Sequence, residues 1–213
     1  MVDVILVYPK TGMDFASTVA PPHALLALAA PLQEAGYRVR IIDQRTDPHW
    51  KLHLEKELSS NPVCIGISTM TGPQIHHAME VAHIVRRATD GQMPIVWGGP
   101  HPTTMPEQTL GSDLVDIVCV GEGEETFLEL VRHLSEKRSL AEVCGIASKD
   151  GGRAVVNPSR PLINMDELLP VPWELVDVGT YIHPEMYLKD SPRTLDIGST
   201  SRGCPFKCTF CSS

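Results

Sequence analysis

Short runs of β-branched residues alternate with longer stretches of helical period along the first 140 residues. The strand-like runs lie at 2–8, 39–43, 64–68, 95–97 and 116–120. Such alternation is typical of βαβ units and therefore of a parallel sheet. The pattern predicts an α/β fold, a doubly wound, Rossmann-like parallel sheet of five strands in the order 2-1-3-4-5, with helices on both faces.

The first helical stretch covers residues 22–35 and is expected to end at Gly36, which would act as a left-handed cap. Pro31 falls inside this stretch, where a proline costs roughly 3 kcal/mol because it lacks a donor and clashes with the preceding turn. We therefore expect a kink at Pro31, or a helix that begins again there.

A different pattern follows the first domain. Residues 144–147 and 153–156 flank a Lys-Asp-Gly-Gly turn, which predicts a hairpin. The proline-rich stretch up to residue 192 has no sustained period and predicts an ordered linker that wraps a neighbouring surface. Its aromatic residues are expected to anchor it: Trp173, Tyr181 and Tyr187. Residues 195–200 alternate like a strand.

These segments predict three units along the chain. The first is a domain at 1–140, the second a hairpin and linker at 141–193, and the third a strand and a cysteine-bearing loop at 194–213.

Composition and charge narrow the class of protein. Of 213 residues, 42% are apolar and 21% charged, which is the balance of a folded globular chain. The net charge is −8 and no Lys/Arg stripe occurs, so nucleic acid is not expected as a partner. The apolar N-terminal run is too short for a signal peptide or a membrane span, so we expect a cytoplasmic protein without a membrane partner.

Three of the six cysteines are expected to be core thiols. Cys64, Cys119 and Cys144 each lie in a short apolar, strand-like stretch. A free cysteine in such a setting behaves as a small hydrophobic residue.

The other three cysteines crowd a loop near the C-terminus. Cys204, Cys208 and Cys211 have the spacing C-x3-C-x2-C, with Phe210 just before the third. Thiolates are the usual ligands of iron–sulfur clusters, and a four-iron cluster normally takes four of them. Three thiolates leave one iron open for a small chelating ligand. The alternatives are a zinc site with a histidine as fourth ligand, although structural zinc sites favour paired C-x2-C knuckles, or three free thiols.

Small and polar residues follow three consecutive strands of the predicted sheet. Ligands of doubly wound sheets bind beyond the carboxyl ends of the strands. Hydroxyl groups can hydrogen-bond a polar ring there, glycines let a flat ligand approach the backbone, and helix N-terminal amides are free. The candidate residues are Ser68, Thr69, Met70 and Thr71, then Gly98, Gly99, Pro100 and His101, then Gly121, Glu122, Gly123 and Glu124. For His101, contact with the ligand and a structural role both stay open.

These strand ends resemble the B12-binding domains that precede many radical S-adenosylmethionine (SAM) barrels. The matching motifs are Ser68-x-Met70, Gly98-Gly99, the G-E-G-E sequence from Gly121 to Glu124, and Pro21-Pro22. The cysteine loop likewise resembles that of the radical SAM superfamily, in which SAM chelates the open iron of a [4Fe-4S] cluster. The resemblance covers roughly residues 1–140 and 195–213.

The resemblance implies the cobalamin-binding part of a B12-dependent radical SAM enzyme. The family includes methyltransferases and anaerobic magnesium-protoporphyrin IX monomethyl ester cyclase, and its cofactors are cobalamin, a [4Fe-4S] cluster and SAM, with a small-molecule substrate that the residues do not specify. The D-x-H-x-x-G motif of methionine-synthase-like domains is absent after the first strand. Cobalamin is therefore expected to be base-off without a histidine ligand.

The chain ends two residues after Cys211, so a truncated barrel is expected. The chain alone should then be inactive, and its cysteine loop should be empty or disordered. Two other functions remain open. One is a docking or substrate-recognition domain that has lost cobalamin, and the other is a zinc-binding module.

Overall fold

The structure is a computed structural model that describes most of the chain. The described residues are 2–14, 19–183, 193, 195–198, 201–204, 206, 208 and 209. They form a seven-stranded sheet in the order β2-β1-β3-β4-β5-β6-β7. The five parallel strands are β1 (Val4–Tyr8), β2 (Val39–Asp43), β3 (Cys64–Ser68), β4 (Ile95–Gly98) and β5 (Ile117–Cys119). Their predicted order, 2-1-3-4-5, is confirmed.

The predicted number of strands is wrong, because the predicted hairpin joins the sheet. Its strands are β6 (Ile146–Asp150) and β7 (Arg153–Val156). β6 pairs antiparallel with β5, with Val118 opposite Ala147, and β7 pairs antiparallel with β6. Without β6, the outer edge of β5 would expose unpaired backbone N–H and C=O groups. Part of the segment 141–193, which we expected to be a separate unit, therefore extends the sheet.

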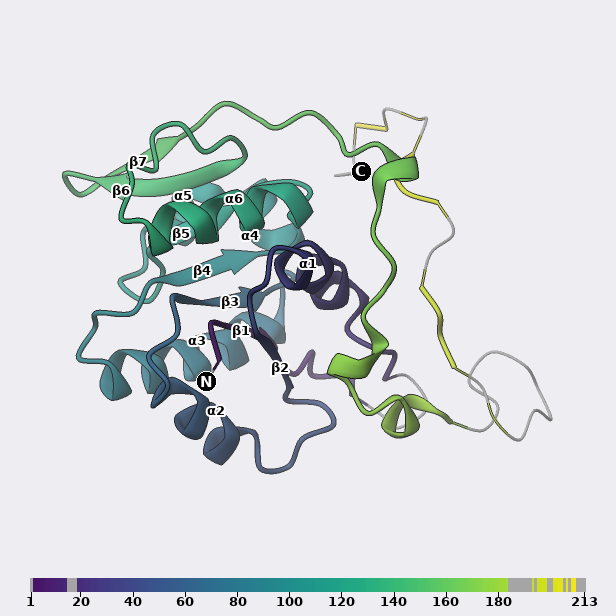
Figure 1. The fold of residues 1–213 in the computed structure, drawn as a ribbon. Helices are drawn as coiled ribbons and strands as arrows, with labels where there is room; N and C mark the ends of the chain where they lie inside the picture. The colour runs from purple at the N-terminus through teal and green to yellow at the C-terminus, as the bar shows by residue number, and fades with distance from the viewer. Residues whose placement is uncertain are drawn as a thin grey trace.

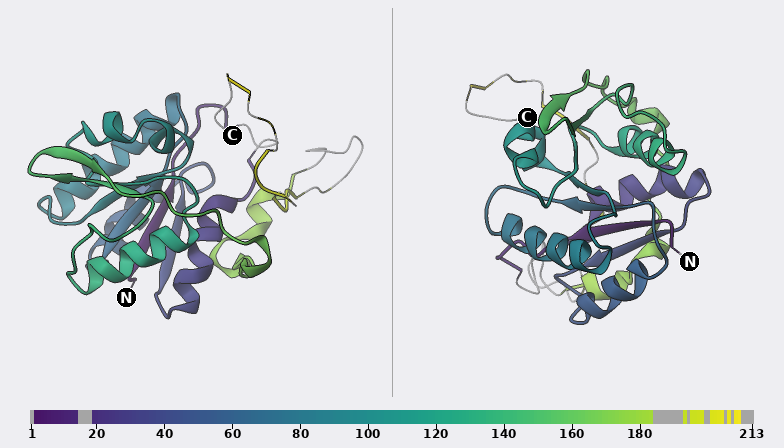
Figure 2. Two further views of the ribbon diagram at one scale, coloured as in Figure 1. Left: turned by 90° about the horizontal axis from the view of Figure 1, so that it is seen from above. Right: turned by 90° about the vertical axis from the view of Figure 1, so that its left-hand side faces the viewer.

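Helices cover both faces of the sheet, as predicted (Figures 1 and 2). One face packs against α1 (His23–Glu34) and α6 (Glu124–Ser135). The other packs against α2 (Trp50–Leu58), α3 (Pro73–Ala88) and α5 (Pro106–Leu110). Strand residues alternate between the two cores, because successive side chains of a strand point to opposite faces.

Two features of α1 bear on its predicted boundaries. Pro31 lies inside one continuous helix, so the helix does not begin again at that residue. Gly36 follows the helix with φ of +87°, and its N–H donates to the Gln33 carbonyl over 2.9 Å. The predicted left-handed cap is therefore confirmed.

Two short helices lie where none was predicted. They are α4 (Pro100–Thr104) and α5, each about one turn long and each beginning with a proline. Proline is favoured at the first helical position because its missing N–H has no intrahelical partner there. Elements this short carry no detectable hydrophobic period.

The linker after β7 runs across the molecule to the opposite edge of the sheet (Figure 1). It contains three 3-10 helices, η2 (Met165–Glu167), η3 (Trp173–Leu175) and η4 (Val178–Tyr181). The Trp173 ring packs edge-on against the His23 ring of α1, with 5.8 Å between centroids. Tyr181 is only 2% exposed. Both predicted anchors are confirmed, whereas Tyr187 lies outside the described residues.

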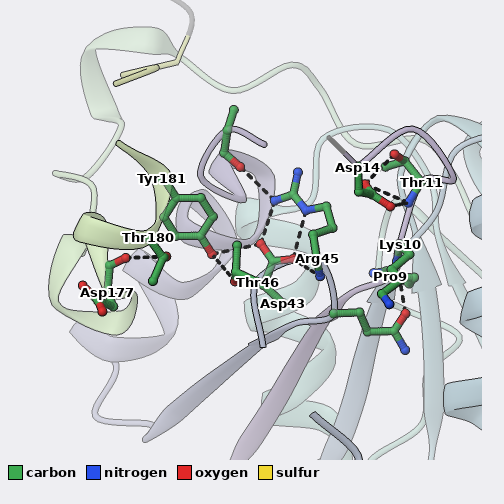
Figure 3. A network of polar contacts seen from close by, with 12 residues as sticks. Pro9, Lys10, Thr11, Asp14, Asp43, Arg45, Thr46, Asp177, Thr180 and Tyr181 are labelled. Atoms are coloured by element: carbon green, nitrogen blue, oxygen red, sulfur yellow. Dashed lines mark hydrogen bonds and ion pairs between the residues drawn. The ribbon is translucent and has the colours of Figure 1, made fainter. Parts of the chain in front are cut away.

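Tyr181 joins a buried polar network at the end of β2 (Figure 3). Its hydroxyl donates to Asp43 Oδ2 over 2.9 Å. Arg45 pairs with the same carboxylate through Nε and Nη2, and Nη2 also donates to the Ala20 carbonyl. Burial raises the pKa of Tyr181, so its neutral hydroxyl remains a donor. The network fastens the end of the linker to the edge of the sheet.

The strand predicted at 195–200 is wrong for the residues described there. Residues 195–198 are not in a strand, and Ser199 and Thr200 lie outside the described part of the chain. Gly198 has φ of +93°, and its N–H donates to Asp196 Oδ1 over 2.7 Å. This local side-chain bond forms a turn, which competes with an extended conformation.

Candidate cofactor site

A cavity of about 670 Å³ opens at the carboxyl ends of β3, β4 and β5, between α1 and α6. It exists because the side chains on this face of the sheet become small toward the strand ends. Gly66 lies in the middle of β3 and Ser68 ends it, Gly98 ends β4, and Cys119 ends β5 with Gly121 following it. The volume is within the roughly 300–1,000 Å³ of small-molecule and cofactor sites.

The cavity has apolar walls and a polar mouth. Its walls come from the apolar faces of α1, α6 and β4, including Leu25, Leu28, Val96 and Phe127. Its polar lining comes from Ser68 at the floor, and from Glu122, Glu124 and Arg202 at what we call the mouth. Such a lining suits a ligand with an aromatic part that is buried and a polar part that stays near the solvent.

The two glycines that end β4 have different roles. A Cβ on Gly99, whose φ is +99°, would lie 2.7 Å from the Thr69 carbonyl oxygen, so glycine is required for the two loops to meet. Thr69 is fully buried, and its backbone bonds Gly98 and His101. A Cβ on Gly98 would have only an ordinary contact, 3.6 Å from Cys119 Cβ. Thr69 and Gly99 therefore hold the floor together, and Gly98 leaves space above it.

Besides the buried Thr69, four of the twelve candidate cofactor residues lie on the same edge of the sheet but do not line the cavity. They are Met70, Thr71, Pro100 and His101. The Thr71 hydroxyl and His101 Nδ1 are 3.1 Å apart, and the Met70 N–H donates to Gln74. These contacts join the loop after β3 to α3 and α4.

All four residues of the G-E-G-E turn, from Gly121 to Glu124, line the cavity. A Cβ on Gly123 would lie 2.6 Å from Leu28 Cδ2, so this glycine lets α6 approach α1 closely. Glu122 Oε2 accepts a hydrogen bond from the Ile163 N–H of the linker over 2.7 Å. The carboxylates thus contact later parts of the chain.

Sequence reasoning missed the part of the site that long-range packing brings together. The α1 residues Ala24, Ala27 and Leu28 line the cavity, as do linker residues and residues 197, 198 and 201–203. The α1 residues follow an ordinary helical period and therefore looked like core. Gly66, in the middle of a buried strand, was the one sequence feature that indicated a site on this face, because a glycine inside a strand often marks a place where a ligand or another backbone approaches closely.

The predicted core thiols are confirmed for two positions. Cys64 and Cys119 are buried, and burial raises the pKa of each thiol to about 12. Cys144 is only partly buried.

In the cysteine loop, Cys204 and Cys208 are exposed, and Cys211 lies outside the described residues. The described parts of the chain contain no group of three or more His, Cys, Asp or Glu residues placed to hold a metal ion. Nor does any helix among them have the length and apolar character needed to cross a membrane.

The comparison with protein families identifies the fold. The model of the B12 binding domain matches residues 11–131, more than half of the chain. This chain belongs to the B12-binding domain family. The match begins in the loop after β1 and ends within α6, so it includes the three strand ends that form the floor of the cavity.

Curated relatives share most of this chain. An uncharacterized methyltransferase of Pyrococcus horikoshii is 36% identical over 217 residues, covering 99% of this chain and 45% of the relative. The anaerobic magnesium-protoporphyrin IX monomethyl ester cyclase of Cereibacter sphaeroides is 30% identical over 214 residues, covering 96% of this chain and 33% of the relative. This chain thus spans less than half of the length of either relative.

Solved structures give the same assignment. The radical SAM methyltransferase TsrM from Kitasatospora setae, with cobalamin and a [4Fe-4S] cluster bound, superposes with a TM-score of 0.63 at 26% identity and covers 80% of this chain and 31% of TsrM. OxsB, a cobalamin-dependent SAM radical enzyme with aqua-cobalamin and SAM bound, has a TM-score of 0.68 at 25% identity and covers 81% of this chain and 24% of OxsB. The predicted resemblance to cobalamin-dependent radical SAM enzymes is confirmed.

Proposed function

We propose that the cavity binds the nucleotide tail of cobalamin, within a B12-dependent radical SAM enzyme of the methyltransferase or cyclase class. The observation that carries the proposal is a cavity of about 670 Å³ at the carboxyl ends of β3, β4 and β5, whose floor lies inside the segment that matches the B12-binding family. In a doubly wound sheet this edge is where ligands bind.

The residues present fit that tail. Its flat benzimidazole base suits the apolar walls, such as Leu28 and Phe127, and the space above Gly98. Its ribose and phosphate suit the polar lining, to which Ser68 at the floor and Arg202 at the mouth contribute. Met70, Thr71, Pro100 and His101 lie outside the cavity on the same edge, so they remain candidates for contact with the corrin ring.

We further propose that the cofactor binds base-off and without a histidine ligand to cobalt. The loop after β1 reads Pro-Lys-Thr-Gly-Met-Asp from Pro9 to Asp14 and supplies no imidazole. Among the described residues that line the cavity, the one histidine is His23. Its ring already packs against Trp173 and lies 3.5 Å from Asp196 Oδ1.

The cysteine loop is proposed to hold a [4Fe-4S] cluster through the thiolates of Cys204, Cys208 and Cys211. Three thiolates leave one iron open, and SAM would chelate it. Cobalamin, when bound, supplies a cobalt that can carry a methyl group. The chain's own residues bind the tail, exclude water from the base and bring the cysteine loop to the mouth of the cavity. Because this chain spans less than half of its relatives, we propose that it binds cobalamin but has no activity alone.

The test is a titration of the chain with hydroxocobalamin, followed by visible absorbance. Gly98→Leu is the informative variant, because its Cβ fits and the rest of its side chain would fill the cavity. We expect at least a tenfold weaker affinity. Ala154→Leu is the matched control, since it adds the same bulk at an exposed position of β7 and should bind like the wild type.

A wild-type affinity in folded Gly98→Leu would contradict the proposed site. Circular dichroism reports whether the variant folds. Should it not fold, Ala27→Phe fills the cavity from the α1 side without changing the sheet, and the same affinity loss is expected.

A further inference from the structure

The described residues that shortly precede Cys204 lie along the cavity. These residues, 196–198 and 201–203, are called the arm here. Residues 197, 198 and 201–203 of the arm line the cavity. Residues 196 and 198 of the arm contact the beginning of α1, and Arg202 contacts the beginning of α6, so the arm has a contact with each of the two helices that form the walls.

The contact at α1 is with His23. Its Nε2 lies 3.5 Å from Asp196 Oδ1. A Cβ on Gly198 would lie 3.2 Å from His23 Nδ1, closer than most side chains tolerate, so glycine lets the arm lie against the ring. His23 also packs against Trp173 of the linker, which fixes the ring.

The contact at α6 is an ion pair with the G-E-G-E turn. Arg202 Nη1 lies 2.6 Å from Glu124 Oε1 and 3.7 Å from Glu122 Oε1. The Glu124 side chain is only 10% exposed, and a carboxylate so placed is costly unless it is paired. Because Glu122 Oε2 also accepts from Ile163, both acids hold later segments of the chain over the cavity.

We propose that Glu122 and Glu124 are positioning residues for the cysteine loop. They hold Arg202, two residues before Cys204, so the loop begins at the mouth of the cobalamin cavity and the arm retains the cofactor beneath it. This inference rests on the proposed function. Its consequence is that the cofactor leaves the cavity only after the Arg202 pair opens.

The charge at the mouth supports this role over direct contact between the acids and the cofactor. Unpaired carboxylates at the mouth would repel the phosphate of the tail. Arg202 compensates part of that charge, and its guanidinium matches a carboxylate in geometry. Replacing Arg202 should therefore both release the arm and leave the phosphate facing two uncompensated acids.

The first test measures how fast bound cobalamin is released from Arg202→Met and Glu124→Gln. A hydrogen bond between charged groups should be worth about a tenfold change in rate, so both variants should release the cofactor about ten times faster than the wild type. Arg138→Met is the matched control, because it removes the exposed pair with Glu136 beyond the far end of α6 and should leave the rate unchanged.

The second test measures position directly. A nitroxide on Cys204, in a background with Cys144, Cys208 and Cys211 replaced by serine, reports its distance to paramagnetic cob(II)alamin by pulsed electron resonance. We expect a narrow distance distribution in the parent chain and a broad one after Arg202→Met. The charge-swapped pair Glu124→Arg with Arg202→Glu should narrow it again.

The outcomes separate the two proposals. If the parent chain binds cobalamin but Arg202→Met keeps both the release rate and the narrow distribution, the positioning role is wrong and the proposed function stands. If the parent chain does not bind cobalamin at all, the proposed function is wrong and the positioning role falls with it.

Discussion

Replacing Tyr181 with phenylalanine tests whether the end of the linker contributes to the stability of the domain. The change removes one hydroxyl and keeps the ring, so it leaves no large cavity in a side chain that is 2% exposed. It deletes the 2.9 Å bond to the Asp43 carboxylate and the 3.3 Å contact with Thr46. Hydrogen bonds to charged groups contribute about 1.5–3 kcal/mol, so we expect a loss of about 2 kcal/mol in unfolding free energy.

The assay is urea unfolding followed by circular dichroism, at neutral and at alkaline pH. Burial and the nearby Asp43 charge raise the pKa of Tyr181 in the folded state. Its stabilising effect is therefore complete below the unfolded pKa near 10 and is lost as the pH rises above it. The difference between wild type and variant should shrink by about 1 kcal/mol between pH 10 and 11.

Tyr37→Phe is the control for the loss of a tyrosine hydroxyl. Tyr37 is partly buried, and the structure describes no hydrogen bond of its side chain, so the change should stay within about 0.5 kcal/mol. Equal stabilities of Tyr181→Phe and the wild type at neutral pH would refute the reasoning, because the linker would then not be fastened through Asp43.

Two further predictions concern the core and the thiols. Gly66→Ala should lower the unfolding free energy by about 1–3 kcal/mol in urea, because its Cβ would lie 2.9 Å from Leu6 Cδ2; an unchanged midpoint would contradict the packing. Iodoacetamide at pH 8 should modify Cys204 but not Cys64 and Cys119, because burial raises the pKa of these two thiols to about 12. Peptide mass spectrometry identifies the modified cysteines, and modification of Cys64 or Cys119 in the folded protein would contradict their burial.

The central elements of the fold were predictable because local pattern and packing agree. The predicted bounds of the second and third strands, 39–43 and 64–68, are those of β2 and β3. Both are short segments that contain β-branched residues at alternate or adjacent positions and have turn residues or a helix cap close by, which is a sequence signal for a strand. Their parallel order followed from the short βα connections.

The remaining parts depend on contacts between distant segments. The hairpin was predicted, but nothing in its own residues indicated that β6 would pair with β5. Residues 195–198 alternate like a strand, yet the Asp196 side chain bonds the Gly198 N–H and forms a turn. A local bond of this kind can override a weak alternating pattern.

The site, too, could be predicted only where it does not depend on contacts between distant segments. The strand ends were predicted from their motifs, and eight of the twelve candidate residues line the cavity or lie in its floor. The role of Glu124 was not predictable, since its partner Arg202 lies far along the chain. Whether a carboxylate faces a ligand or another segment depends on the three-dimensional fold.

The most direct test of the account compares cobalamin with cobinamide, the corrin that lacks the nucleotide tail. Both are titrated into the chain by visible absorbance under the same conditions. If the cavity between α1 and α6 binds the tail, cobalamin should bind in a base-off form and cobinamide at least a hundredfold more weakly, a difference of about 2.7 kcal/mol. Equal affinities for the two corrinoids would contradict the account.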